Sequence, residues 1–577
     1  MVTEVAHAES SRGLRGLSER TLVVVPTAGQ VPPELVPFTQ SRHSALIRLQ
    51  RKPVIYWTME YLLGLGFDWF SFAVGRRPND AVECFVQQLA GWRSSLVFAR
   101  PDRDAGLVYS VYCALREAEP QRDCYDHVLL VLGDTYFRFP PADLGAGDRS
   151  FILTGRFDAA EDRSEDWCLV RRSADGRLAE EYVNKQPGLQ DETLGIVAGI
   201  YFLKDARLFM SCVEAAVAAG EGELHLALAR YQEVDPIECL DCAEWYDCGH
   251  LPNLLRSEQR MVQERSFNEV TLDKVRGIVT KRSSEAAKLR DEISYYESLP
   301  KGLECLFPRI VAADPEEPSV SLEFYAYPSL SDHLVFNTLH LRIWELVFHK
   351  LLSIVQLFRS EPIPPRHDGR FLEACRSMYV GKTRDRLERL RRESPEWRQV
   401  LGAPELLLNG RVVRNVDALL EEVERALPRL ARAGDLSVIH GDLCFSNILY
   451  DLPTGTCRLI DPRGSFGEPG NLGDLKYDVA KLYHSVDGLY DFIINDLFSV
   501  DYAGAPRELT YRIYFDKAEL KARFEQAFFG DLAFSRWEIL VIEGLLFLSM
   551  LPLHAESRNR QFAMFATGLE RLETAFS

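Results

Sequence analysis

Short apolar segments alternate with amphipathic segments between Thr21 and about Val262, and this alternation constrains the fold more than any other feature of the chain. Leu22–Pro26, His127–Leu132 and Ile196–Leu203 have the length and composition of buried strands. Pro53–Leu65 places its apolar side chains near one face of a helix. Strands that alternate with helices form a largely parallel sheet covered on both faces. We therefore expect an α/β, doubly wound domain in this part of the chain.

The pattern changes near residues 262–266. Two predicted strands, Phe267–Leu272 and Ile278–Lys281, precede a predicted helix at about Ser284–Leu299. The rest of the chain reads as mostly helical, with one compact β segment at Val438–Asp461. A chain of 577 residues is too long for one core at about 100–200 residues per domain. The expected division is a polar tail at residues 1–20, a first domain at 21–262 and a second domain at 266–577.

The chain is acidic, because 67 Lys and Arg stand against 85 Asp and Glu, a formal charge of −18. An acidic surface repels phosphate backbones, so we expect no nucleic-acid partner.

The most apolar stretch, Ile539–Leu553, contains Glu543 and is expected to be a core helix and not a membrane span. The N-terminal residues lack an apolar signal core, and the 12 cysteines are expected to be reduced thiols in a cytoplasmic protein. The charge-rich segment Arg384–Arg398 predicts a helix face in water.

A polar segment inside Val438–Asp461 carries the strongest chemical pattern. Asp442 and Asn447 lie five residues apart on one loop, and Asp461 follows the second strand of a predicted hairpin. Phosphoryl transfer needs a carboxylate near the attacking hydroxyl and oxygen ligands for Mg²⁺. The pattern can supply one base and two metal ligands. The alternative is a polar loop without a catalytic role, which the placement of Asn447 and Asp461 disfavours.

This pattern, His440-Gly441-Asp442, four residues, Asn447 and then Ile460-Asp461, closely resembles the aminoglycoside phosphotransferase and choline kinase families. The resemblance implies a bilobal, protein-kinase-like fold that phosphorylates a small alcohol or sugar with ATP and Mg²⁺. It implies Asp442 as the catalytic base, Asn447 and Asp461 as Mg²⁺ ligands, and His440 as the residue that orients the loop. Asp478 matches a downstream element of the family that is usually structural.

The expected N-lobe, at about residues 266–332, should supply the ATP-binding residues of such a kinase, and the C-lobe follows at about 333–577. Lys281 ends a predicted strand and Glu292 lies on the next helix, the order of the phosphate-binding lysine and its glutamate partner. The alternative is that Lys281 is an ordinary surface lysine. Glu323 and Tyr325 lie in the segment that matches the adenine-reading hinge. Arg463 can brace the metal loop, which we favour, or face an anionic acceptor.

A second resemblance covers residues 21–262, which look like a sugar-phosphate nucleotidyltransferase with a GT-A-like fold. The matching segments are Val25–Gly29, Lys52-Pro53, Gly133-Asp134, Asn184-Lys185, Ala198–Tyr201 and Trp245–Gly249. The resemblance implies Asp134 and Asp247 as ligands of Mg²⁺ and Lys185 as a contact of the substrate phosphate. It also implies Ala28, Gly29 and Gly199 as substrate-binding positions, with a nucleoside triphosphate, CTP being one candidate, as the second substrate.

The first loop departs from the pattern of that family. Gly29 is followed by Gln30-Val31-Pro32-Pro33, without the second glycine or the arginine, and Ser44 stands at the position of the catalytic lysine. Arg42 and Arg48 are the nearby cations that could replace the missing charges. The alternative is a domain that kept the fold and lost the triphosphate site.

Together the two resemblances indicate a bifunctional enzyme. The kinase would make a phosphate ester and the nucleotidyltransferase would activate it, as in nucleotide-sugar and polysaccharide biosynthesis. The alternative is a small-molecule kinase with a non-catalytic first domain. The sequence leaves the acceptor and the oligomeric state open.

Overall fold

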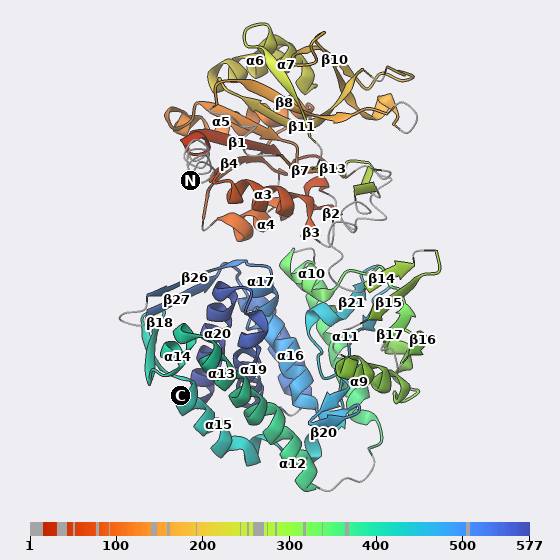
Figure 1. The fold of residues 1–577 in the computed structure, drawn as a ribbon, viewed down its shortest axis with the longest axis vertical. Coiled ribbons are helices and arrows are strands. Elements are labelled where there is room, and N and C mark those ends of the chain that lie inside the picture. The colour runs from red at the N-terminus through yellow and green to blue at the C-terminus, as the bar shows by residue number, and fades with distance from the viewer. Residues whose placement is uncertain are drawn as a thin grey trace. The chain divides into compact units, whose positions relative to one another are not determined.

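The computed structural model divides into two compact units, Met1–Arg265 and Ser266–Ser577 (Figure 1). It describes residues 16–577 apart from 32–42, 50–51, 77–79, 92, 140–146, 159–161, 192, 243, 251–252, 255, 258–269, 274, 283–285, 315–318, 337–338, 364–367, 504–507 and 533. Most of the expected tail, the start of the predicted strand at 267–272 and Arg42 lie outside the described residues.

The first unit is built on a nine-stranded sheet. Its parallel part has the order β6-β1-β4-β5, and β12 pairs in parallel with β8. The strands β8, β9, β10 and β11 join through antiparallel pairs. The expected parallel pairing is therefore present among β1, β4, β5 and β6 and again between β8 and β12, which is reached through α6 and α7. The strands β8 to β11 depart from it, because their pairs are antiparallel and β9 and β10 form a hairpin. The strands are β1 (Thr21–Pro26), β4 (Trp69–Ala73), β5 (Ser95–Ala99), β6 (His127–Val131), β8 (Ser150–Arg156), β9 (Cys168–Arg172), β10 (Ala179–Asn184), β11 (Gly195–Leu203) and β12 (Ile237–Asp241).

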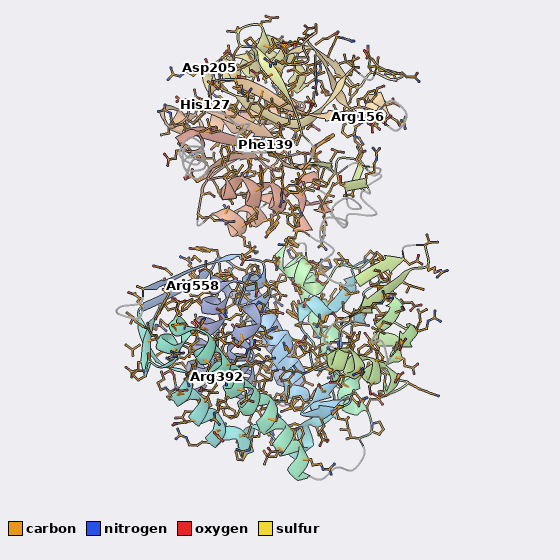
Figure 2. All side chains as sticks on the ribbon, in the orientation of Figure 1. His127, Phe139, Arg156, Asp205, Arg392 and Arg558 are labelled. Carbon is orange, nitrogen blue, oxygen red and sulfur yellow. The ribbon has the colours of Figure 1, made fainter. Side chains whose placement is uncertain are left out.

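Helices cover both faces of this sheet, as Figure 1 shows. Every residue of β1 is buried; Leu22 and Val24 belong to the core cluster that includes residues of α5, α6 and α7, and their neighbours point to the other face. Asp205, labelled in Figure 2, begins α6 by accepting hydrogen bonds from two backbone N–H groups of its first turn. The helices are α3 (Val54–Gly64), α4 (Ala81–Ala90), α5 (Leu107–Glu117), α6 (Ala206–Ala218) and α7 (Leu224–Gln232).

Two short strand pairs lie beside the main sheet of the first unit. β7 (Thr135–Arg138) pairs with β13 (Glu244–Asp247), and β2 (Arg48–Leu49) pairs with β3 (Lys52–Pro53). Because β7 follows β6 almost directly, the β7–β13 pair ties the end of the parallel sheet to residue 247.

The second unit begins with a four-stranded antiparallel sheet of order β14-β15-β17-β16 and one helix, α9. Gly277, with φ +65°, makes the turn between β14 and β15. The elements are β14 (Val270–Asp273), β15 (Ile278–Arg282), α9 (Ala286–Glu297), β16 (Ile310–Asp314) and β17 (Ser319–Glu323).

The larger part of the second unit packs helices around α19, whose residues from Glu538 to Met550 are all buried. Among the described residues, Arg536–His554 is the one helical stretch that passes a length-and-hydropathy test for a membrane span, and 78% of its test window is buried in the fold. This is the environment of a core helix. The helical segments are α10 (Leu330–Val335), α11 (Leu341–Ser360), α12 (Asp368–Arg376), a π-helical turn (Ser377–Gly381), α13 (Lys382–Glu393), α14 (Pro395–Leu401), α15 (Val416–Leu430), α16 (Leu475–Val486), α17 (Tyr490–Ile494), α18 (Ala518–Asp531), α19 (Arg536–Met550) and α20 (Arg558–Phe576).

The expectation of one β segment in this region is wrong. A second, four-stranded sheet of order β19-β18-β27-β26 is present, because β18 pairs in parallel with β27 about a hundred residues later in the chain. The predicted hairpin is also present, as β21 paired with β22, and β20 pairs with β25. The strands are β18 (Glu405–Leu408), β19 (Arg411–Arg414), β20 (Leu436–Val438), β21 (Ile448–Asp451), β22 (Thr456–Leu459), β23 (Ser465–Phe466), β24 (Glu468–Pro469), β25 (Leu472–Asp474), β26 (Phe498–Ala503) and β27 (Glu508–Ile513).

Candidate functional site

The hairpin β21–β22 sets the spacing of the polar residues in the second unit. Ile460 donates its backbone N–H to the carbonyl of Asn447 at 3.0 Å, which extends the hairpin pairing by one step. Asn447 and Asp461 therefore lie at the same open end of the hairpin. Asp461 has φ +56°, a left-handed conformation that Asp tolerates better than most residues. The chain turns there, away from the strand direction.

A buried carboxylate holds the loop that precedes the hairpin. Asp478, on α16, accepts the backbone N–H groups of His440 at 2.6 Å and Gly441 at 2.8 Å. His440 is fully buried; its Nδ1 accepts the N–H of Asp442 at 3.2 Å, and its ring stacks on Phe307. Burial lowers the pKa of His440 to about 4, so the imidazole is neutral at pH 7. His440 and Asp478 are both fully buried, and their contacts with the backbone position the loop.

Asp442 has the charge and access of a group that meets a substrate. Its Oδ1 lies 2.8 Å from the ammonium of Lys481 on α16, and 38% of its side chain is exposed. Asn447 donates to the backbone oxygen of Asp442 at 2.9 Å and to its Oδ2 at 3.2 Å. Burial raises the pKa of Asp442, but the charge of Lys481 outweighs burial and brings the pKa to about 2. Asp442 is therefore ionised throughout the physiological range.

Lys281 connects the small sheet to the hairpin loop. Its ammonium lies 2.7 Å from Glu292 Oε2 on α9 and 3.0 Å from Asp461 Oδ1, which is 180 residues later in the sequence. Lys281 is therefore not an isolated surface lysine. Burial raises the pKa of Glu292, and the charge of Lys281 opposes this.

The predicted hinge residues lie at the end of β17. Glu323 is the last residue of that strand, and the hydroxyl of Tyr325 donates to Glu323 Oε2 at 3.1 Å. The guanidinium of Arg458, on β22, lies over the ring of Tyr325 at 4.9 Å. These contacts join the small sheet to β22, at the connection between the sheet and the helical part of the unit.

Asn447 and Asp461 fit Mg²⁺ by their chemistry. Both offer hard oxygen atoms at the same end of the hairpin, Asp461 lies beside Lys281, and half of the Asp461 side chain is exposed. Mg²⁺ is usually held by one or two protein oxygens together with water and substrate phosphates. No group of three or more acidic, His or Cys side chains that could hold a metal occurs among the described residues. A two-ligand site completed by phosphate is consistent with that finding.

The first unit has a cavity of about 920 Å³ at the carboxyl ends of its parallel strands. The strand order changes direction at β1, because β4 and β5 lie on one side of it and β6 on the other. Ligands of such sheets bind at this point. The lining residues come from the segments after β1, β4, β5 and β6 and from the start of α5. They include Ala28, Gly29, Gln30, His43, Ser44, Gly75, Arg76, Asp80, Arg103, Gly106, Ser110, Gly133 and Asp134.

Asp134 and Asp247 flank one glycine. A Cβ atom placed on Gly249 would lie 3.2 Å from Asp134 Oδ2 and 3.5 Å from Asp247 Oδ1. The pairing of β7 with β13 and a hydrogen bond from the Cys248 N–H to the Asp134 carbonyl bring the two carboxylates together. Burial, and then the charge of Asp134, raise the pKa of Asp247 to about 7. Burial also raises the pKa of Asp134. Two neighbouring buried carboxylates of this kind fit a divalent cation, which would neutralise their charge.

The other predicted residues of the first unit divide into two groups. Lys185 exerts its charge on Asp134, and Gly199, with φ +84°, accepts the backbone N–H of Leu132 at 2.9 Å beside the cavity. Arg48 begins β2 and is not among the residues that line the cavity. Arg42 lies outside the described residues.

Two cations that line the cavity, Arg76 and Arg103, are absent from the sequence-based prediction. Arg76 follows β4, and Arg103 follows β5 and stacks on Tyr109 at 4.8 Å. Their positions just after predicted parallel strands were a usable signal, because the carboxyl ends of parallel strands share one edge of the sheet.

The second unit contains a phosphotransferase domain. The sequence pattern of APH, the phosphotransferase enzyme family, matches residues 278–522. This range includes Lys281, Asp442, Asn447 and Asp461, so the kinase resemblance is confirmed at the level of the family. A search of curated proteins found no match.

Solved structures similar to the N-terminal region include pyrophosphorylases. UDP-glucose pyrophosphorylase from Acinetobacter baumannii is 16% identical over 43% of this chain and 95% of its own, with a TM-score of 0.34. UDP-glucose pyrophosphorylase complexed with UDP-glucose is 14% identical over 43% and 100%, with a TM-score of 0.35. Nucleoside-diphosphate-sugar pyrophosphorylase from Vibrio cholerae is 15% identical over 41% and 99%, with a TM-score of 0.34. The fold of the first unit is defined here by its own strand order and the cavity at the strand ends.

Proposed function

We propose that the second unit transfers the γ-phosphoryl group of ATP to the hydroxyl of a small alcohol or sugar. The observation that carries this proposal is the convergence of Lys281, Asp442, Asn447 and Asp461 around one hairpin end. Lys281, held by Glu292, is the contact for the α- and β-phosphates. Asn447 and Asp461 would hold Mg²⁺, which neutralises charge on the phosphates when it is bound.

Asp442 is the proton acceptor in this proposal. The acceptor oxygen forms a bond to the γ-phosphorus while the bond from that phosphorus to the β–γ bridging oxygen breaks, and ADP leaves. A carboxylate with a pKa of about 2 is a weak base. It takes the hydroxyl proton only after bond formation has made that proton acidic. Asp442 therefore orients the hydroxyl first and accepts its proton late.

The experiment is ADP release from the full chain with a panel of sugars, polyols and amino alcohols. We expect Asp442→Asn to keep the fold and Mg-ATP binding and to lower turnover by roughly 10²–10⁴, the usual contribution of a positioned base. Asp451→Asn is the matched control, because Asp451 ends β21 and accepts only from the turn that follows it, at Thr454. Full activity of Asp442→Asn would contradict the assignment.

We further propose that the first unit transfers a nucleotidyl group to a phosphate ester and releases pyrophosphate. The supporting observation is the pair of carboxylates, Asp134 and Asp247, beside a cavity that two arginines line. The ester oxygen would attack the α-phosphorus, and the bond to the α–β bridging oxygen would break. Arg76 and Arg103 are then the cations for the leaving pyrophosphate, where charge develops.

Pyrophosphate release tests this second activity. Asp134→Asn should abolish pyrophosphate release and leave ADP release intact. Arg103→Gln should lower pyrophosphate release while Arg48→Gln does not, because Arg103 lines the cavity and Arg48 is not among its lining residues. If the wild type releases no pyrophosphate with any common nucleoside triphosphate and any phosphorylated acceptor, the first unit is a non-catalytic domain attached to a kinase.

The two activities would form one sequence of reactions. The kinase product is a phosphate ester, which is the class of substrate that the first unit would need. The proposed product of the full chain is a nucleotide-activated building block, as used in nucleotide-sugar and polysaccharide biosynthesis.

A further inference from the structure

Four cations from three elements gather next to the loop that carries Asp442. Lys382 and Arg386 lie one turn apart on α13, Lys481 lies on α16, and Arg463 follows Asp461. We refer to these four residues as the basic cluster. The core helix α19 packs against both α13 and α16, which brings the two helices into one layer.

Direct contacts join the basic cluster to the catalytic loop. Lys481 pairs with Asp442 at 2.8 Å. Arg463 donates its backbone N–H to the His440 carbonyl at 3.0 Å and its Nη1 to the hydroxyl of Tyr477 at 3.2 Å. Its side chain also covers Gly441, where a Cβ atom would lie 2.8 Å from the Cβ of Arg463. Arg463 thus braces the loop, as the sequence indicated, and its guanidinium points toward α16.

The cluster carries more positive charge than the surrounding protein neutralises. Lys481 has Asp442 as its partner, but Lys382, Arg386 and Arg463 form no ion pair with any described carboxylate. The hydrogen bond of Arg386 goes to the backbone oxygen of Ser549, at 2.8 Å. In a chain of formal charge −18, three cations without a carboxylate partner at one place are unusual.

The outward-facing arginines of the same helix behave differently. Arg384 pairs with Glu424 at 2.9 Å, Arg389 with Glu393 at 2.9 Å, and Arg391 with Asp417 at 2.7 Å. Arg392, labelled in Figure 2, is exposed. The predicted solvated face of Arg384–Arg398 is therefore real, but Arg386, inside that segment, belongs to the other side of the helix.

The electrostatics follow this arrangement. Burial and the charges of Arg463, Arg386 and Lys481 lower the pKa of Lys382 to about 8. Burial raises the pKa of Tyr477, but Lys382, Arg463 and Lys481 outweigh burial and bring it below its ordinary value. Both shifts indicate a site that would gain from an added negative charge.

The backbone before α13 has an uncommon conformation. The π-helical turn Ser377–Gly381 separates α12 from α13 and ends immediately before Lys382. A π turn inserts one extra residue per turn, which rotates the faces of the following helix, and such turns are frequent at functional sites. Here it sets which residues of α13 point inward.

We propose that the kinase acceptor is a small hydroxyl compound with an anionic group, a carboxylate or a phosphate, which the basic cluster binds beside Asp442. This inference rests on the proposed kinase function. In that proposal the ion-paired residues Lys281 and Asp461 bind the nucleotide and its Mg²⁺, so the basic cluster is left for the acceptor. The anion would pair with Lys382, Arg386 and Arg463, and the same charges would repel a quaternary ammonium or polyamine acceptor.

The first test is acceptor choice by the full chain. ADP release is measured with matched acceptors: glycerol and glucose as neutral members, glycerate and glucuronate as carboxylates, glycerol 3-phosphate and glucose 6-phosphate as phosphates, and choline and glucosamine as cations. We expect kcat/KM to be at least about 10-fold higher for one anionic class than for its neutral counterpart, because charge-assisted hydrogen bonds are about twice as strong as neutral ones. The two anionic arms distinguish carboxylate from phosphate.

The second test does not depend on the acceptor skeleton. Full-length protein with a non-hydrolysable Mg-ATP analogue is titrated with glucuronate and with inorganic phosphate. Arg386→Gln and Lys382→Gln should weaken binding of the preferred anion roughly 10- to 100-fold, the usual effect of losing a charged contact. They should raise the acceptor KM more than they lower kcat. Arg389→Gln, on the outer face of α13, is the matched control and should change neither.

The outcomes separate the two proposals. The anionic-acceptor proposal is overturned if neutral or cationic acceptors react as well as anionic ones. It is also overturned if the protein binds no anion, or if anion binding is unchanged in folded Arg386→Gln protein. In each of these cases the kinase proposal stands. A chain that binds no Mg-ATP would refute the kinase proposal itself.

Discussion

Replacement of Lys481 by methionine tests how the environment of Asp442 controls the proposed base. The two charged groups are 2.8 Å apart. Coulomb's law gives about 6 kcal/mol at an effective dielectric constant of about 20. That figure is an upper bound, because 38% of the Asp442 side chain is exposed and water screens the pair. Cations beside carboxylates in proteins lower the carboxylate pKa by about 1–3 units, or about 1.4–4 kcal/mol.

Lys481→Met should therefore raise the pKa of Asp442 from about 2 by about 1–3 units, to about 3–5. The pKa rises because burial, which Lys481 no longer offsets, favours the neutral acid, and Arg463 opposes that rise only in part. In the wild type Asp442 stays ionised down to pH 3. In the variant kcat/KM for ADP release should fall below about pH 5, because protonated Asp442 cannot accept the hydroxyl proton.

The assay is the pH profile of kcat/KM with saturating Mg-ATP, together with thermal unfolding at each pH. Lys204→Met is the control, since it removes a lysine–aspartate pair of similar length, 2.7 Å, from the first unit. If folded Lys481→Met protein loses kcat/KM at the same low pH as the wild type and Lys204→Met, Lys481 does not control the pKa of Asp442 and the prediction is refuted.

Three further predictions concern the two units separately. Gly464→Ala should lower the Tm of the second unit by more than Gly277→Ala. Both glycines have φ near +70°, but a Cβ atom on Gly464 would collide with a backbone carbonyl of α9, whereas one on Gly277 would meet no neighbouring atom. Equal decreases in Tm for the two variants would exclude that contact. The pKa of Asp247 is about 7 in the folded first unit and about 4 in the unfolded chain, so between these pH values the folded state holds a proton that the unfolded state has lost. The free energy of unfolding of the first unit should therefore fall as pH rises from about 4 to 7. Mg²⁺ should then raise Tm more at pH 8 than at pH 5, and Asp247→Asn should remove that difference; an unchanged Mg²⁺ effect would contradict a metal role. A fragment of residues 266–577 should fold and bind Mg-ATP in calorimetry, and an insoluble fragment would show that it needs residues 1–265.

Much of the candidate kinase site could be predicted because its residues are close in sequence. Asp442, Asn447 and Asp461 lie on one loop and hairpin, whose geometry is local. Glu292 follows Lys281 by 11 residues, on the helix after its strand, so that pair was also a short-range inference. The contact between Lys281 and Asp461 was not, because it spans 180 residues and depends on how the small sheet meets the hairpin.

The residues that the sequence missed are held together by long-range packing. Arg76 and Arg103 come from two strand ends, and β18 pairs with β27 across most of the helical region. In the first unit, counting back from Lys52 gave Ser44, which does line the cavity, and Arg48 was named as a nearby cation, but Arg48 begins the β2–β3 pair and is not among the lining residues. Sequence spacing gives no distance between segments that meet only through a sheet.

The sequence by itself determined the α/β class of the first unit and the phosphotransferase motif, and it led us to expect a domain boundary near residues 262–266. These features follow from strand and helix periods and from hairpin geometry, which are properties of short segments. Only the tertiary structure decided which cations face a substrate. Arg384 and Arg386 are two residues apart on a charge-rich helix and look alike in the sequence. The π turn before α13 and the packing of α19 place one against Glu424 in water and the other beside the backbone of Ser549, in the basic cluster. The direction of a side chain depends on the rotation of its helix against its neighbours, which no local pattern records.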